Sequence, residues 1–268
     1  MSTNIMEAVS VRAGSKHMSP QRLLRAYLLE MYYEFLRTFR NPGFGIPFII
    51  LPVGLFTVFS SMDPGGAQAA TPEARLQLFA GMSIFGIMGP PMFGFGAYLA
   101  IERQMKQLEF KRAIPMPPGA HLLAKMTCAL SYAVIVIVSM LLVSTMMHKV
   151  SFTLPQMTLI SLILLLGVAP FCAIGFFIGS RASAAASSGI TTLLFLPLVY
   201  LSGLFFPLPK IIEALALIMP PFYLKELVLA AGGGKPIWIG GPLVHVVILT
   251  VFTFILSALA AKRLARNG

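Results

Sequence analysis

Six long stretches of this chain contain no Asp, Glu, Lys or Arg, and each is long enough to cross a bilayer. They are residues 41–62, 76–101, 126–148, 150–180, 182–209 and 236–261. A spanning helix needs about 20 mainly apolar residues. The pattern therefore predicts an all-α membrane protein with six transmembrane helices. The fourth and fifth are expected to be joined by a short loop over residues 179–189, built mostly of Gly, Ser and Ala.

The segment before the first span has a different pattern. Residues 1–18 are of mixed polar composition and are predicted to be a flexible N-terminus. Over residues 19–41 an amphipathic interfacial helix is expected, with Ser19 as N-cap and Pro20 at the first helical position. Its apolar face consists of Leu24, Leu28, Met31, Phe35 and Phe39. Residues 42–268 would then form the six-span transmembrane domain.

Composition supports a membrane environment. The 268 residues are 57% hydrophobic and only 11% charged, whereas a soluble domain carries about 25% charged residues. The two cysteines, Cys128 and Cys172, lie in apolar stretches and suggest neither a disulfide framework nor a metal site. No cleavable signal peptide is recognisable in the first 40 residues.

The net charge of +11 reflects basic residues gathered on one side rather than a nucleic-acid partner. Fifteen of the 20 Lys and Arg residues fall in the N-terminal segment, the loop 102–125, the fourth-to-fifth loop and the C-terminal tail. The opposite side keeps Arg75, Lys149, Lys210, Lys225 and Lys235. This bias predicts that both termini and the loop 102–125 are cytoplasmic.

The segment from Ile101 to Lys125 is the most charged part of the chain. Ile101, Met105 and Leu108 recur at intervals of four and three, as on one face of a helix. Glu102 with Lys106, and Glu109 with Arg112, are spaced to pair along that helix, which Pro115 would stop. Two interpretations remain open: a short rigid helix that contacts a cytoplasmic partner, or a solvated loop that only sets topology.

Between the fifth and sixth spans, residues 202–235 are too apolar for an ordinary loop and too interrupted by proline to span. We expect a re-entrant helical hairpin that dips into the outer leaflet. The alternative is an interfacial helix that lies flat.

Motifs for independent chemistry are weak. The run from Gly232 to Lys235 lacks the Ser or Thr and the preceding strand of a nucleotide-binding loop. No predicted span contains a carboxylate, which argues against an ion-driven pump. His245 is the titratable residue inside a span, and packing is favoured over a proton relay. A rhomboid-like protease pairing Ser202 with His245 lacks the Gly-x-Ser-Gly motif and an oxyanion donor set. We predict no catalytic residue, metal or bound cofactor in this chain.

Two motifs carry a resemblance to a known family. The first, after the second span, comprises Glu102, Arg103, Leu108, Glu109, Pro115, Pro118, Leu122, Leu123 and Lys125. The second comprises Leu201-Ser202-Gly203, Phe205-Phe206-Pro207, Pro220 and Tyr223. In both, the chain resembles the permease subunits of ABC-2 type ATP-binding-cassette exporters, whose second span is typically followed by Glu-Arg-Glu-x-Gly-Thr-Leu-Glu, Thr-Pro-Val-Ser-Pro and Leu-Leu-Gly-Lys. The chain departs from that pattern at Gln104, Lys106 and Gln107.

The resemblance implies partners and site residues. Two permeases, as a homodimer or paired with a close relative, would assemble with two separate ATPase subunits that bind ATP and magnesium. The loop 102–112 would be the coupling helix, with Glu102, Met105, Leu108, Glu109 and Arg112 contacting the ATPase. The outer hairpin would shape the exit gate, and the candidates for a pathway or gate are Tyr98, Tyr200, Phe205, Phe206 and Tyr223.

The resemblance also implies a function. The chain would be a permease of a bacterial cytoplasmic (inner) membrane, exporting a hydrophobic or amphipathic compound such as a drug, natural product or lipid-like molecule. The alternatives are export of a polysaccharide or lipid-linked glycan, and a membrane scaffold or receptor without transport.

Overall fold

The computed structural model describes residues 20–61, 71–107, 120–147, 150–205, 214–237 and 240–267, and within these ranges it contains helices and no strands. The predicted flexible segment 1–18 lies outside them. The helices are α2 (Pro20–Phe39), α3 (Pro42–Ser61), α4 (Pro72–Phe93), the π-helix η3 (Gly94–Tyr98), α5 (Leu99–Gln104), α7 (Ala120–Met146), α8 (Leu154–Leu166), α9 (Val168–Arg181), α10 (Ala184–Leu201), α12 (Pro220–Ala231) and α13 (Pro242–Asn267).

Six helical segments in the described ranges are long and apolar enough to cross a membrane, which confirms the prediction of six spans. They are Gly43–Ser61, Pro72–Gln104, Ala120–Met146, Leu154–Arg181, Ala184–Leu201 and Pro242–Leu264. The second joins α4, η3 and α5, and the fourth joins α8 and α9. The π-helix follows Pro90 and Pro91. Since a prolyl residue lacks the N–H that an α-helix needs, its neighbourhood is where a helix changes its hydrogen-bond register.

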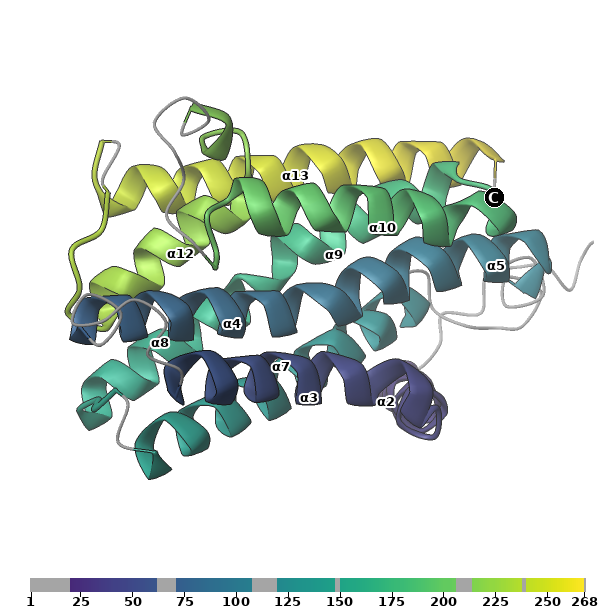
Figure 1. Ribbon diagram of the computed structural model, residues 1–268. Coiled ribbons are helices and arrows are strands. Elements are labelled where there is room, and N and C mark those ends of the chain that lie inside the picture. The colour runs from purple at the N-terminus through teal and green to yellow at the C-terminus, as the bar shows by residue number, and fades with distance from the viewer. Residues whose placement is uncertain are drawn as a thin grey trace, which may run out of the picture.

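The second span forms the centre of the bundle. Its most apolar window is 72% buried, against 17% for the windows in α3 and α13. In Figure 1, α4 runs between α3 on one side and α9, α10 and α13 on the other. Gly175 lets α9 approach closely, because a Cβ there would lie 2.6 Å from the carbonyl oxygen of Pro91. Gly179, four residues on, would likewise meet the carbonyl of Phe95. The glycines of α9, in the fourth span, therefore serve close packing against the second span.

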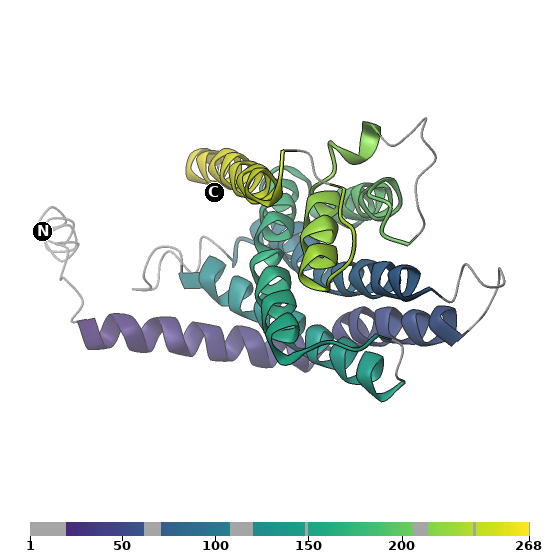
Figure 2. The same cartoon turned by 90° about the vertical axis from the view of Figure 1, so that its left-hand side faces the viewer.

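Helix α2 crosses the direction of the spans. In Figure 1 it is seen nearly end-on at the lower right, beside the end of α3, and in Figure 2, where the spans are viewed end-on, it extends lengthwise. It packs on α7, where the ring of Phe39 stacks on that of Tyr132 with centroids 4.4 Å apart. The predicted break at Asn41 is confirmed, because α2 ends at Phe39 and α3 begins at Pro42. The chain thus turns sharply between a transverse helix and the first span.

One local prediction is wrong, and the structure bears on one question that the sequence left open. The predicted loop over residues 179–189 is much shorter, because α9 continues to Arg181 and α10 already begins at Ala184. Ser183 caps α10 by accepting a hydrogen bond from the Ala186 amide, so the small residues that follow are helical. For the segment after Ile101, which the sequence left open between a helix and a loop, the structure interrupts the helix at Met105. Helix α5 ends at Gln104, and Lys106 has a φ of 56°.

Within the predicted hairpin, the described part contains α12. This helix has 12 residues and is about 18 Å long at 1.5 Å per residue, so it is too short to span. It packs against α4, α8, α10 and α13, and nearly all of its side chains are buried. Residues 206–213, in the part of the chain between α10 and α12, lie outside the described residues. In Figure 2, helix α12 (yellow-green) lies between spans, which distinguishes it from a loop on the surface.

Candidate functional site

Glu102, in the last turn of the second span, is the centre of a buried charge network. Its carboxylate accepts hydrogen bonds from Arg37 of α2 at 2.7 Å and from Lys125 of α7 at 3.0 Å. His121 of α7 places Nε2 2.9 Å from the other carboxylate oxygen. Glu102 is only 1% exposed. One carboxylate therefore joins the transverse helix to the ends of two spans.

Two further acidic groups from α2 complete the network. Glu34 accepts a hydrogen bond from Lys125 at 2.7 Å, and a Glu30 oxygen lies 3.1 Å from His121 Nδ1. Both contacts of the His121 ring can be donor contacts only in the imidazolium form. Buried charges are tolerated when they are paired and hydrogen-bonded, and removal of one partner leaves the other uncompensated. The network is therefore a strong connection between α2, α5 and α7.

The pKa of Arg37 depends on the two carboxylates beside it. The side chain is half exposed, and its guanidinium lies 2.7 Å from Glu102 and 3.7 Å from Glu34. Burial alone would lower the pKa of Arg37, but the carboxylates of Glu102 and Glu34 outweigh it and raise the pKa above its ordinary value. Arg37 therefore stays cationic and adds a partly solvent-screened contact between α2 and the second span.

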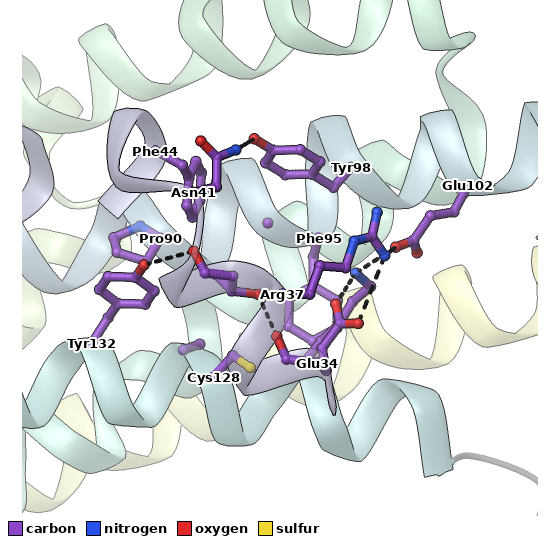
Figure 3. A pocket seen from close by; sticks show the side chains of 14 residues that line it. Glu34, Arg37, Asn41, Phe44, Pro90, Phe95, Tyr98, Glu102, Cys128 and Tyr132 are labelled. Carbon is purple, nitrogen blue, oxygen red and sulfur yellow. Dashed lines mark hydrogen bonds and ion pairs between the residues drawn. The ribbon is translucent and has the colours of Figure 1, made fainter. Parts of the chain in front are cut away.

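A cavity of about 210 Å³ adjoins the network between α2, α3, η3 and α7. Figure 3 shows Glu34, Arg37 and Glu102 on one side of it and aromatic rings on the others. The rings belong to Phe44, Phe95, Tyr98 and Tyr132. Asn41 donates to the Tyr98 hydroxyl at 3.4 Å, and the Tyr132 hydroxyl donates to the carbonyl of Thr38 at 3.4 Å. The cavity thus has a charged end and an aromatic body.

The two residues after Glu102 attach the span to the turn between α9 and α10. The Arg103 guanidinium donates to the Ser180 carbonyl and, at 2.6 Å, to the Ala182 carbonyl. The Gln104 side-chain oxygen accepts from the amide of Ala184, at the start of α10, at 3.1 Å. A displacement of the chain after Gln104 would therefore act on α2 and α7 through Glu102, and on α9 and α10 through Arg103 and Gln104.

The predicted ATPase contacts occupy different environments. Met105 is 65% exposed just past the end of α5. Glu102 is buried, and both of its oxygens bind groups of this chain. Leu108, Glu109 and Arg112 lie outside the described residues. Contact of these five residues with an ATPase stays a prediction.

The predicted gate residues do not form one group. Tyr200 and Phe205 pack edge-to-face with ring centroids 6.1 Å apart. Tyr98 instead lies against Asn41 and Phe44 beside the cavity. Tyr223 is buried in α12 and donates to the Leu217 carbonyl at 2.6 Å. Phe206 lies outside the described residues, and the gate role of all five stays a prediction.

His245 belongs to the packing around α12. It is fully buried, and its ring lies edge-on to Tyr223 with centroids 5.0 Å apart. Helix α12 also contains two buried charged residues, Lys225 and Glu226, shortly after Tyr223. Lys225 pairs with Glu226 at 3.2 Å and donates to the Gly203 carbonyl, while Glu226 accepts from the Ile237 amide. These contacts bind α12 to the chain segments on both sides of it.

One group of side chains has the residue types of a metal site. Glu30, Glu34 and His121 place ligand atoms within 4.8 Å of one another. However, Glu34 is paired with Lys125, and Arg37 is close by. These cations compensate the carboxylates and would repel a metal ion, so the donor set fits a charge network better than a metal centre.

Sequence analysis missed most of this site. It paired Glu102 with Lys106, four residues away, whereas the partners that the structure gives Glu102 are 19 to 65 residues distant. The available signal was the position of Glu102 at the edge of a charge-free stretch. A carboxylate there needs a partner, but its position does not say which one.

Six apolar helices, a transverse helix and a charged junction at one end of the bundle define a multi-pass membrane protein. Residues 26–231 match the model of a family described as ABC-2 type transporter. The chain belongs to this family. It is a permease, the membrane component of an ABC transporter, and such permeases work with an ATPase subunit.

A curated relative agrees with this assignment. The chain is 24% identical over 215 residues to "Putative transport permease YvfS" of Bacillus subtilis (strain 168). The match covers 76% of this chain and 85% of the relative.

Proposed function

We propose that the protein is an export permease, which moves a hydrophobic or amphipathic compound out of the cytoplasm while a separate subunit hydrolyses ATP. Two copies of the chain would form the pathway, with two ATPase subunits that bind ATP and magnesium. The observation that carries this proposal is the junction at Glu102, Arg103 and Gln104, which connects the end of the second span to four other helices.

The junction would convert a push from the ATPase into movement of the spans. Met105, exposed directly after α5, is suitably placed to receive that push. Force applied there would pass through Glu102 to α2 and α7, and through Arg103 to the α9–α10 turn. Packed helices respond by discrete rearrangement rather than by continuous deformation. The residues from Leu108 to Arg112 would complete the ATPase contact.

The orientation follows from charge. Arg37, Arg103, Lys125, Arg181, Lys262 and Arg263 belong to the end of the bundle that carries the junction. An excess of basic residues is typical of the cytoplasmic side. We place this end in the cytoplasm and α2 in the membrane interface. Leu24 and Leu28 are 61% and 56% exposed, which supports contact with lipid.

At the opposite end, α12 would serve as part of the exit gate. It is too short to span, it is buried among four helices, and Lys225 and Glu226 hold the segments before and after it. In this proposal, opening would move α12 together with Tyr223, while Tyr200 and Phe205 move with α10. A path lined by Tyr200, Phe205 and Tyr223 would favour an apolar or amphipathic cargo over a highly charged one.

The test is reconstitution with the cognate ATPase in liposomes. We expect ATP-dependent movement of an amphipathic dye away from the side that carries the ATPase, and retention of the ATPase during purification. Met105→Ala and Glu109→Ala should reduce both, while Lys235→Gln, at the opposite end, should reduce neither. Retention and transport that are unchanged in every loop variant would contradict the coupling role. A complex that moves nothing would favour the scaffold.

A further inference from the structure

A basic crevice lies between the end of α9 and the end of α13, beside the contacts that Arg103 makes with the α9–α10 turn. It has a volume of about 450 Å³ and is lined by Arg181, Leu259, Lys262 and Arg263. All three cationic side chains are exposed, and none of the four lining residues is acidic. Three like charges around one crevice raise the local positive potential, which attracts an anion. The crevice therefore has the electrostatic character of an anion site.

An apolar ridge leads along α13 to this crevice. Val251, Ile255, Leu259 and Arg263 follow at intervals of four, so they form a continuous row on the helix surface. The three apolar members are 50%, 51% and 44% exposed. On α9, the Arg181 guanidinium lies 3.9 Å from the centre of the Phe177 ring. On both helices, apolar surface precedes a cationic group.

We propose that this crevice holds the phosphate of an anionic phospholipid, with an acyl chain along the ridge of α13. The cations would bind the head group, and Val251, Ile255 and Leu259 would contact the chain. Basic pockets between spans on the cytoplasmic side are suited to anionic head groups. The inference rests on the proposed function only for the placement of this end at the cytoplasmic leaflet.

The ridge favours a lipid over an acidic surface of the ATPase. Val251, Ile255 and Leu259 all lie inside the candidate span Pro242–Leu264, at a depth that a soluble partner does not reach. A free phosphate ion would use the cations and leave the ridge without a ligand. A phospholipid satisfies both features at once.

The experiment measures lipid retention by the purified chain in nanodiscs that contain equal amounts of phosphatidylglycerol and phosphatidylcholine. Native mass spectrometry of the released protein should show bound phosphatidylglycerol. The triple variant Arg181→Gln, Lys262→Gln and Arg263→Gln should weaken this binding about 100-fold, at roughly fivefold for each cation. The control Arg22→Gln, Arg25→Gln and Lys235→Gln removes the same charge elsewhere and should bind as the parent does.

A charge-conserving variant and a competition with phosphate distinguish a bound lipid from a free ion and from the effect of misfolding. Arg181→Lys with Arg263→Lys keeps the charge and should retain the lipid. Inorganic phosphate at millimolar concentration should not displace it. Equal loss in both triple variants, no preference over phosphatidylcholine, or full displacement by phosphate would overturn the assignment. Retention of lipid with loss of the ATPase would assign the cations to that subunit instead. Neither ATP nor transport enters the lipid measurement, so its failure is distinct from failure of the proposed function.

Discussion

Replacement of Glu102 by glutamine should strongly destabilise the protein, although Glu102 lies at the end of a span. The change keeps the size of the side chain and removes its charge. Lys125, which is buried, and Arg37, which is half exposed, would then share Glu34 as their remaining carboxylate partner among the described residues. His121 would lose one of its two carboxylate contacts. The variant therefore leaves buried positive charge without full compensation.

The magnitude follows from these contacts. Loss of one partner of a buried ion pair costs about 3–5 kcal/mol, and a hydrogen bond to a charged group contributes about 1.5–3 kcal/mol. The Arg37 contact counts for little because solvent screens its exposed half. The buried contacts to Lys125 and His121 therefore dominate, and we expect a loss of about 3–5 kcal/mol. For a chain of this length that corresponds to a fall in Tm of roughly 10 °C.

The assay is thermal unfolding in detergent, followed by intrinsic tyrosine fluorescence and by size-exclusion chromatography after heating. The matched control is Glu73→Gln, which removes a carboxylate from the exposed pair with Lys235 at 3.0 Å. That pair is 64% and 86% exposed and should contribute at most about 1 kcal/mol. A double-mutant cycle with Lys125→Met isolates the coupling between Glu102 and Lys125. If Glu102→Gln and the control lower Tm equally, or if the cycle is additive, the network does not hold the helices as argued.

Three further predictions concern packing, attachment and partner contact. Gly175→Ala would drive a Cβ into a carbonyl of α4 and should cost about 1–3 kcal/mol in thermal unfolding, while Gly189→Ala, with open space around it, should be neutral or slightly stabilising. Arg103→Ala should release the α9–α10 turn; faster amide hydrogen exchange at Ala184 and the residues after it would reveal this, and unchanged exchange would refute it. Met105→Ala should leave Tm within about 1 °C, since the side chain is largely exposed, and should reduce ATPase retention; a large fall in Tm would mean a structural role.

The span count could be read from the sequence because the requirement for a spanning helix is local. A stretch of about 20 residues without charges satisfies that requirement by itself. The break between α2 and α3 was equally local, since Asn41, Pro42 and Gly43 disfavour continuation of a helix. Local reasoning failed at the α9–α10 turn, where small residues were taken for a loop. Ser183 instead caps a helix that begins directly after it.

The tertiary structure decided the partners of the charged residues. Spacing along a helix paired Glu102 with Lys106, but helix α5 ends at Gln104 and Lys106 has left-handed backbone geometry. Packing instead brings Arg37, His121 and Lys125 to Glu102 from two other helices. A sequence determines which segments must avoid water, because transfer free energy depends on the residues of each segment. Which charges meet depends on how the helices cross, and those crossings are set by contacts between residues far apart in the chain.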